Sequence, residues 1–199
     1  MKRYLLIFAS LFTVSFFYSQ ELLDSVALAT YQEYTDLKEA LENPDNVIKI
    51  SLRKKKYKDF PMDVLKLKNL QYLDLSKNEI KELPDSIVTL KNLQYLIVSR
   101  TGLERLPKNI GALKNLVHLN VNQNEISVIP YSFGELEKLE VADLWSNNLE
   151  YFPESMSKLQ RLKMMDLRNI LIPQTNQDQI QAMLPNTTIF FSPPCNCSW

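Results

Sequence analysis

The sequence is poor in the residues on which most enzyme active sites depend. It contains one histidine, two cysteines and three glycines among 199 residues. The single histidine, His118, leaves one candidate base for a histidine-dependent triad, and the three glycines form no phosphate-binding loop. Cys195 and Cys197, near the C-terminus, are only half of a usual zinc ligand set, and the fold is expected to form without a disulfide. We therefore expect no catalytic function, no cofactor and no metal site.

A surplus of charge of one sign is also absent. The 23 lysines and arginines balance the 23 aspartates and glutamates, so the field of the whole protein gives no reason to expect a nucleic acid or an anionic membrane as the main partner. Hydrophobic residues make up 45% of the chain and aromatic residues 10%, which excludes a disordered polymer. One folded domain is the expected organisation.

The sequence has one long hydrophobic run, and it stands at the N-terminus. Lys2 and Arg3 precede the apolar residues 4–18, and the polar Gln20 follows. This order is typical of a secretory signal peptide, which we assign to residues 1–19. A membrane-spanning helix needs about 20 apolar residues, so we expect removal of the run rather than its retention as an anchor. The protein is then exported to the periplasm, the cell surface or the medium, with no stable membrane span.

What the sequence has in abundance is a repeat with a period of 23 residues, present as six units between residues 47 and 172. A typical unit carries apolar residues spaced L-x-x-L-x-L, then a polar position, an isoleucine or leucine, and a proline; Lys55 and Ile170 occupy the polar column in the first and last units. The first apolar column is Val47, Leu70, Leu93, Leu116, Leu139 and Leu162. The polar column is Asn78, Thr101, Asn124 and Asn147, and the proline column is Pro61, Pro84, Pro107, Pro130 and Pro153.

Each position of the repeat has a mechanical role. The alternating L-x-L core predicts a short strand that buries one face. Asparagine at the following turn can satisfy buried backbone groups of neighbouring coils through its donor and its acceptor, and Thr101 still offers a hydroxyl there, so its coil is expected to close too. Proline has a fixed φ and no backbone N–H, so it prevents a regular β-sheet on the side of the coil opposite the strand. Since one unit cannot cover its own leucines, stacked units must share a continuous core.

The spacing L-x-x-L-x-L-x-x-N-x-[IL] resembles the leucine-rich repeat family. This resemblance implies an α/β solenoid, with a curved parallel sheet on its concave side and short helical or extended segments on its convex side. The L-P-x-x-I spacing is similar to the intracellular signalling and disease-resistance branch of the family. The signal peptide predicts export instead, so we expect an exported protein of bacterial type.

The two ends of such a solenoid need covers for their apolar edges. Residues 20–46 are predicted to form an N-terminal helical cap ahead of a turn at 44–46. Its apolar residues at helical spacing are Ala27, Tyr31, Tyr34, Leu37 and Leu41. Residues 173–191 are predicted to form a C-terminal cap, with a short helix over 177–184 and a strand over 188–191, and residues 192–199 a tail.

The residues between the buried leucines face outward and form columns across the coils. Large apolar and aromatic side chains stand there although the solenoid does not require them, and tyrosine, tryptophan and arginine often anchor protein contacts. We predict a non-catalytic module that binds a protein partner through Tyr72, Tyr95, Ile97, His118, Val141, Trp145, Met164 and Arg168. The alternative interpretation is that tyrosine and valine merely suit a strand.

Two charged features leave other functions open. Arg53, Lys54, Lys56 and Lys58 form a dense basic run that suits an anionic polysaccharide such as a glycosaminoglycan, and a carbohydrate-binding adhesin is the alternative function. The simpler interpretation of the run is a solvated edge. Asp74, Asp143 and Asp166 share a column, for which a solvated strand face is favoured over a calcium site or an acid–base pair.

Overall fold

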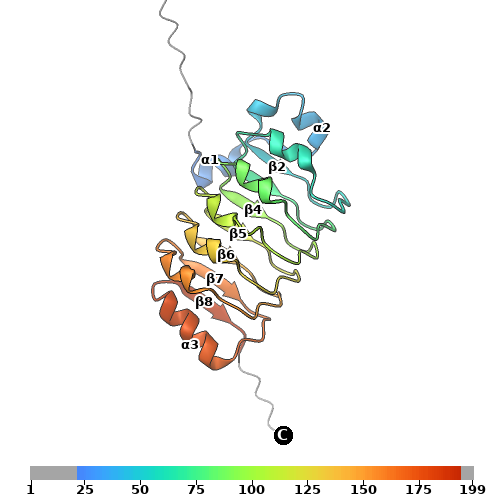
Figure 1. Ribbon diagram of the computed structural model, residues 1–199. Helices are drawn as coiled ribbons and strands as arrows, with labels where there is room; N and C mark the ends of the chain where they lie inside the picture. Colours follow the sequence, from blue (N-terminus) through green and yellow to red (C-terminus); the bar gives the residue numbers. More distant parts are fainter. Residues whose placement is uncertain (1–21, 194–199) are drawn as a thin grey trace, which may run out of the picture.

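The computed structural model describes residues 22–193, and within that range the chain forms one open sheet of eight parallel strands in sequence order (Figure 1). The assigned signal peptide and Cys195 and Cys197 of the tail lie outside the described residues. None of the helices within 22–193 has the length and hydropathy needed to cross a membrane. The strands are β1 (Glu33–Tyr34), β2 (Lys49–Ser51), β3 (Tyr72–Asp74), β4 (Tyr95–Ile97), β5 (His118–Asn120), β6 (Val141–Asp143), β7 (Met164–Leu167) and β8 (Thr188–Phe191).

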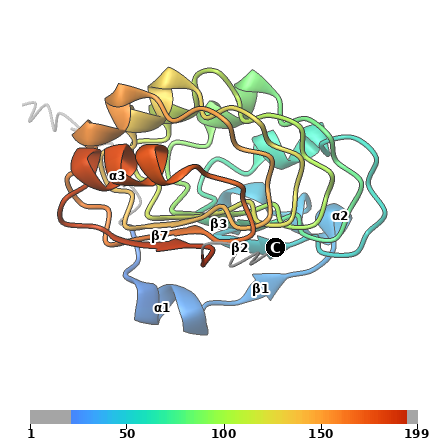
Figure 2. The same cartoon turned by 90° about the horizontal axis from the view of Figure 1, so that it is seen from below.

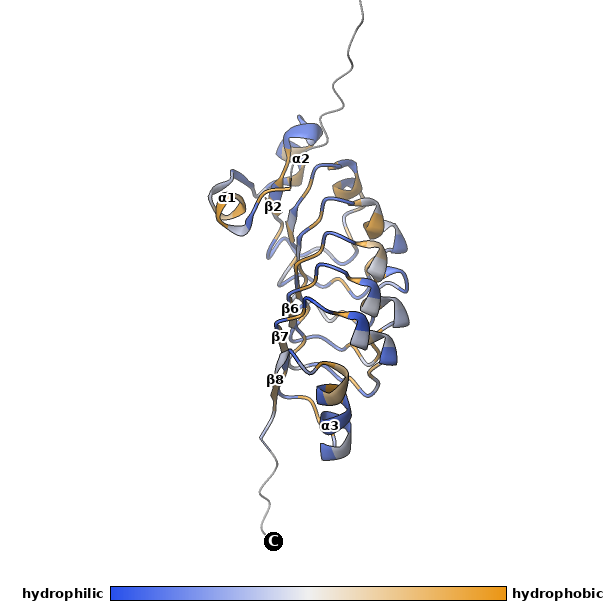
Figure 3. Ribbon diagram, turned by 90° about the vertical axis from the view of Figure 1, so that its left-hand side faces the viewer, coloured by the Kyte–Doolittle hydropathy of each residue, from blue (hydrophilic) through white to orange (hydrophobic). Residues whose placement is uncertain are grey.

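Short 3₁₀ helices return the chain on the far side of the sheet, and the sheet is gently curved with its hollow side away from them (Figure 3). Four of these helices directly follow a proline of the repeat, whose restricted φ ends the extended backbone. The expected convex side is therefore present. The 3₁₀ helices are η1 (Pro44–Asn46), η2 (Met62–Lys66), η3 (Asp85–Thr89), η4 (Ile110–Ala112), η5 (Tyr131–Glu135) and η6 (Glu154–Lys158).

The core lies between the sheet and the 3₁₀ helices and runs through all coils as one cluster. Strand pairing advances by one repeat at each step, so that Leu73 pairs with Leu96 and Leu96 with Leu119. All three leucines are fully buried. The inward column predicted from the L-x-x-L-x-L spacing is thereby confirmed, and each coil is covered by its neighbours.

The polar column closes the turns as expected. The Oδ1 atom of Asn124 accepts hydrogen bonds from the backbone N–H of Thr101 and of Leu103, both at 3.0 Å. Its Nδ2 atom donates to the carbonyls of Val98 at 2.7 Å and Val121 at 2.9 Å. Thr101 differs from the asparagines, because its hydroxyl donates to Asn124 Oδ1 of the next coil at 3.0 Å. The side chain of Asn124 thus stabilises backbone groups of two adjacent coils.

The segment before the first coil corrects one expectation, because it is not a single helical cap. It contains α1 (Ser25–Thr30), β1 and α2 (Leu37–Ala40). The carboxylate of Asp24 caps the start of α1, and that of Asp36 caps the start of α2. Helical spacing predicted one helix, but the two N-cap aspartates begin two separate helices. The residues between these helices extend the sheet as β1.

The two parts of this segment lie in different places. Tyr34, Leu37 and Leu41 pack against the core and cover the first coil, as expected of a cap. Ala27 and Tyr31 belong to the part around α1, which lies on the hollow side of the sheet, opposite the 3₁₀ helices (Figures 2 and 3).

The C-terminal cap follows the expectation more closely. A helix, α3 (Gln174–Met183), begins after Pro173 and buries Ile180. The strand β8 then pairs with β7 and ends the sheet. The helix starts three residues before the predicted position, because Pro173 favours a helix start directly after it.

Candidate partner-binding face

The outward residues of the strands form one surface, which we call the strand face. It consists of three columns aligned by the parallel pairing of β2 to β7. The first column is Lys49, Tyr72, Tyr95, His118, Val141 and Met164; the second is Ser51, Asp74, Ile97, Asn120, Asp143 and Asp166; the third is Arg53, Ser76, Ser99, Asn122, Trp145 and Arg168. All eight residues predicted to bind a partner lie in these columns. Seven of them are partly exposed and Arg168 is exposed.

The first column is a continuous stack over β2 to β5. The ammonium group of Lys49 lies 5.1 Å from the centre of the Tyr72 ring. The rings of Tyr72 and Tyr95 are 6.0 Å apart, and those of Tyr95 and His118 are stacked at 5.7 Å with an angle of 19° between their planes. Glu33 of β1 pairs with Lys49 at 3.6 Å and ends the stack. Aromatic and cation–π contacts of this kind hold side chains in fixed positions.

Burial shifts the pKa values of all three rings of this stack away from the charged form. It raises the pKa of Tyr72 to about 12, helped by the charges of Asp74 and Glu33. It also raises the pKa of Tyr95, with a smaller contribution from Glu140. Burial lowers the pKa of His118, so the imidazole is neutral at pH 7. The stack is thus an uncharged surface that ends at the Lys49–Glu33 ion pair.

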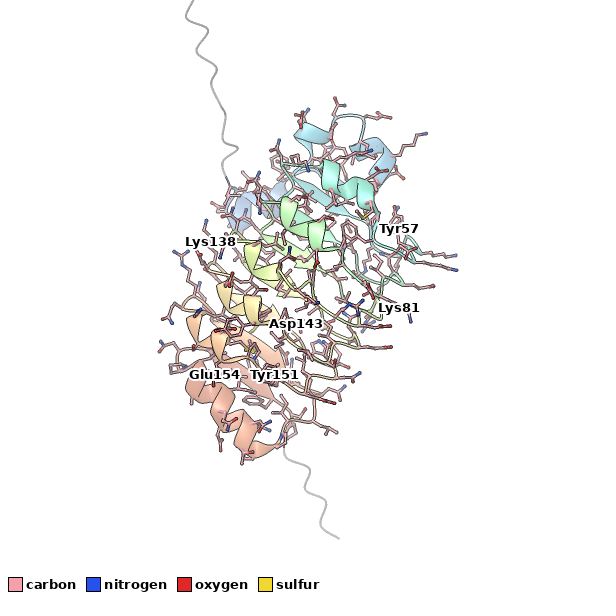
Figure 4. The ribbon with its side chains drawn as sticks, viewed as in Figure 1. Tyr57, Lys81, Lys138, Asp143, Tyr151 and Glu154 are labelled. Atoms are coloured by element: carbon pink, nitrogen blue, oxygen red, sulfur yellow. The ribbon has the colours of Figure 1, made fainter. Side chains whose placement is uncertain are left out.

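The face has a different character over β6 and β7, where acidic groups are held in place. Asn122 donates to Asp143 Oδ2 at 2.6 Å, and Asp143 comes from β6 (Figure 4). Burial raises the pKa of Asp143, against the effect of the Asn122 hydrogen bond. The guanidinium of Arg168 donates from Nε to both oxygens of Asp166, at 3.0 and 3.1 Å, and lies 5.6 Å from the ring centre of Phe190.

The aspartate column is less solvated than expected. Asp74 and Asp166 are buried, and Asp143 is partly buried. The carboxylate of Asp74 accepts the backbone N–H of Ser76 at 2.7 Å, and that of Asp166 accepts the N–H of Arg168 at 3.1 Å. The prediction of a solvated face is wrong for these two residues, because each carboxylate turns back onto its own strand end. Within residues 22–193 no group of three acidic, histidine or cysteine side chains is placed to hold a metal ion.

The basic run forms a wider patch than the sequence alone indicated. Arg53, Lys54, Lys56 and Lys58 are all exposed. Lys54, Lys77 and Arg100 occupy the same left-handed turn position of successive coils, with φ of 59°, 57° and 57°. The charges of Arg53, Lys54 and Arg100 lower the pKa of Lys77, Arg53 most strongly.

Sequence reasoning missed three groups that contribute to the face. Lys77 and Arg100 extend the basic patch, and the 23-residue period is the signal that would have found them. Phe190 extends the face onto β8, beyond the last predicted repeat, as the partner of Arg168. Gln71 and Gln94 are buried just before the first column, where they contact the backbone of Leu23.

Comparison with protein families gives a match to the family described as "Leucine-rich repeat region", over residues 48–119 and again over 90–186. The two overlapping matches together span more than half of the chain. They agree with the resemblance found in the repeat spacing. A comparison with curated proteins found no match.

Solved structures share the architecture. A leucine-rich repeat protein of Leptospira interrogans is 29% identical, with a TM-score of 0.64 over 82% of this chain and 49% of that one. Internalin C2 of Listeria monocytogenes is 19% identical, with a TM-score of 0.63 over 79% of this chain and 66% of that one. The ectodomain of the Arabidopsis thaliana receptor kinase GASSHO1/SCHENGEN3 is 22% identical, with a TM-score of 0.58 over 72% and 17%. The chain thus spans about half the length of the Leptospira protein. The likeness to the last two shows the fold alone.

Proposed function

Because the chain belongs to the leucine-rich repeat family, we propose that it is an exported, non-catalytic module that recognises a protein partner through the strand face. The observation that carries this proposal is the stack of Tyr72, Tyr95 and His118 on the hollow side of the sheet. These rings lie outside the core cluster, so the solenoid does not need them for its own packing. Aligned, partly exposed aromatic rings supply rigid contact area at low entropic cost, which suits a protein interface.

Trp145 and Arg168 add two further anchors at the other end of the face. Both belong to the third column, where the neighbouring coils carry the smaller Ser99 and Asn122. Tryptophan and arginine are enriched among the residues that dominate binding energy. Arg168 is held by Asp166 and Phe190, so little of its freedom remains to be lost on binding.

The size of the face limits the strength of the interaction. Six strands about 4.8 Å apart, each taken as five residues or about 16 Å long, project to roughly 400 Å². A standard interface buries about 800 Å² on each partner. We therefore expect modest affinity, or a partner that also contacts the rims of the face.

Proteins of the same architecture include receptors solved with a bound partner. The Arabidopsis receptor ectodomain was solved in complex with CASPARIAN STRIP INTEGRITY FACTOR 2. This precedent supports a binding role for the fold and says nothing about the partner of this chain. Export rests on the N-terminal sequence 1–19.

A pull-down with matched variants tests the proposal. The double variant Tyr95→Ala, Trp145→Ala removes two anchors of the strand face. The control double variant Tyr131→Ala, Tyr151→Ala removes two rings on the convex side, which are 64% and 55% exposed. Proteins captured by the wild type and the control but lost from the strand-face variant are the expected result. Equal capture by all three, with unchanged circular dichroism, would contradict the proposal.

The second candidate function is binding of an anionic polysaccharide by the basic patch. It is favoured by the positions of Lys77 and Arg100, which continue the run of residues 53–58 across three coils. Binding through this patch must weaken steeply with added salt, whereas an aromatic contact must not. Retention on immobilised heparin that is lost on Lys54→Ala, Lys77→Ala substitution, and kept in the Tyr95→Ala, Trp145→Ala variant, would favour the polysaccharide.

A further inference from the structure

The row of residues just before the first column changes its burial along the solenoid. Ile48, Gln71 and Gln94 are buried, with Ile48 outside the core cluster. The later members of the same row, one repeat apart, are the partly exposed Val117 and Glu140 and the exposed Lys163. Something must therefore cover the first three members and not the rest. Figures 2 and 3 show that α1 lies over this part of the hollow side.

The cover is held through its main chain. The backbone N–H of Leu23 donates to Gln71 Oε1 at 2.9 Å. Gln94 Nε2 donates to the Leu23 carbonyl and to Gln71 Oε1, both at 2.8 Å. The side chains that precede β3 and β4 thus bind both main-chain polar groups of Leu23. Contacts of this kind recognise a polypeptide backbone whatever its side chain.

One apolar side chain of the same segment is buried as well. Leu28 of α1 is only 2% exposed, yet it is not part of the core cluster. Its neighbour Val26 on the same helix is 74% exposed. Asp24 caps this helix, which has six residues. A helix of this length is not stable by itself in water, so its order depends on the surface beneath it.

We propose that Ile48, Gln71 and Gln94 form a peptide-binding site, which takes an extended segment followed by a helical turn that carries a leucine. Residues 22–31 fill the site in the free protein, and a segment of the same chemistry supplied by another chain exchanges with them. This peptide-binding site is separate from the strand face, and the proposal does not depend on the partner proposed for that face. Leu23 is bound by side chains of the sheet, and the Leu28 and Tyr31 amides donate within the segment, so the exchange leaves the pairing between the coils intact.

The first test uses the full chain and a labelled synthetic peptide of residues 22–31. Leu28→Glu in the protein places a charge in the apolar contact and releases the resident segment. Val26→Glu adds the same charge on the exposed side of α1 and is the matched control. The peptide is expected to bind the Leu28→Glu protein at least about tenfold more tightly than the wild type or the control, because the site is then open. Fluorescence anisotropy measures the affinity.

Two further variants decide whether the site is the one described. A peptide with Leu28→Glu, and a protein with both Leu28→Glu and Gln94→Ala, are each expected to lose about tenfold or more in affinity, since each lacks one part of the contact. No binding to the Leu28→Glu protein while its circular dichroism matches the wild type would overturn the proposal. Binding that is indifferent to Gln94→Ala would overturn it as well.

Hydrogen exchange on the wild-type protein provides a test that needs no variant. The Leu28 amide donates to the Asp24 carbonyl at 2.9 Å, and the Val98 amide donates between strands to Asn120 at 2.8 Å. An exchangeable segment opens while the coils stay folded, so Leu28 is expected to exchange about tenfold faster than Val98 or more. Exchange of both amides at the same rate would show that residues 22–31 leave the surface only when the whole protein unfolds.

Discussion

The two halves of the strand face share one scaffold and differ only in the residues that the scaffold leaves free. Over β2 to β5 the first column is an uncharged stack that ends at Lys49, and residues 22–31 lie beside it. Over β6 and β7 the face carries Asp143, Asp166 and Arg168, fixed by hydrogen bonds. The inward leucines and the asparagine column continue through both halves. In this solenoid, the residues that form the core therefore alternate along each strand with the residues through which we propose that a partner is recognised.

The largest effect is expected from a change on the inward side of β4. Leu96→Ala leaves a cavity in the fully buried column and should lower the free energy of unfolding by about 2–5 kcal/mol. Tyr95→Ala, one residue earlier but on the strand face, should cost about 1 kcal/mol or less. Chemical denaturation of the two variants measures both. Similar losses would show that the tyrosine stack is part of the stabilising core.

The next effect concerns the asparagine column, which continues through both halves. Asn124→Ala removes a side chain that binds four backbone groups of two coils, and should lower the free energy of unfolding by about 2–3 kcal/mol because buried groups lose their partners. Asn148→Ala, at an exposed position in the next coil, is the control and should change it by less than about 0.5 kcal/mol. Equal effects of the two changes would contradict the role of the asparagine column.

A smaller gain is expected where the column is interrupted. Thr101→Asn supplies the donor and the acceptor that the other asparagines use, and should raise the free energy of unfolding by about 0.5–1.5 kcal/mol. The Thr101 hydroxyl bond to Asn124 is lost, which offsets part of the gain. Thermal unfolding measures the change. A decrease would show that the coil at Thr101 is built around the smaller side chain.

The smallest effects distinguish the two halves by pH, and they have opposite signs. Burial lowers the folded pKa of His118 below its ordinary 6.5, so acidification protonates the unfolded chain first. This contribution destabilises the protein as pH falls below about 6.5 and levels off below the folded pKa. Burial raises the folded pKa of Asp143 above its ordinary 3.8, so the folded state takes up its proton first. This contribution stabilises the protein as pH falls through the raised pKa and levels off below about 3.8.

Variants separate these two contributions. His118→Gln should remove the destabilising step near pH 6, and Asp143→Asn should remove the stabilising step at lower pH. Thermal unfolding of both variants and the wild type between pH 4 and 8 measures the difference in slope. Parallel pH profiles for all three proteins would contradict the effect of burial on the pKa values of His118 and Asp143.

The 23-residue spacing was sufficient to predict the solenoid, because one pattern determines both the inward column and the register of neighbouring strands. Leu73, Leu96 and Leu119 lie side by side as that period requires. The N-terminal cap was wrong in form because apolar spacing carries no record of where a helix restarts. The signal for two helices was present in Asp24 and Asp36, whose side chains cap the two helix starts, but the apolar spacing does not include them.

The columns of the strand face follow from the same period, but the N-terminal segment that lies beside them does not. That Tyr95 and His118 stack could be expected from their paired positions on β4 and β5. The cover over Gln71 and Gln94 could not, because it joins residues 48 and 71 positions apart in the chain. No local pattern encodes a contact between an irregular N-terminal segment and the side of a regular sheet.

Site-specific photo-crosslinking tests the central claim most directly. A photoreactive phenylalanine analogue replaces Tyr95 on the strand face in one protein and Tyr131 on the convex side in another, and each is irradiated in an extract of the cells that produce the protein. An adduct with a discrete protein at position 95 and none at position 131 is the predicted result. An adduct at position 131 alone would contradict recognition through the strand face.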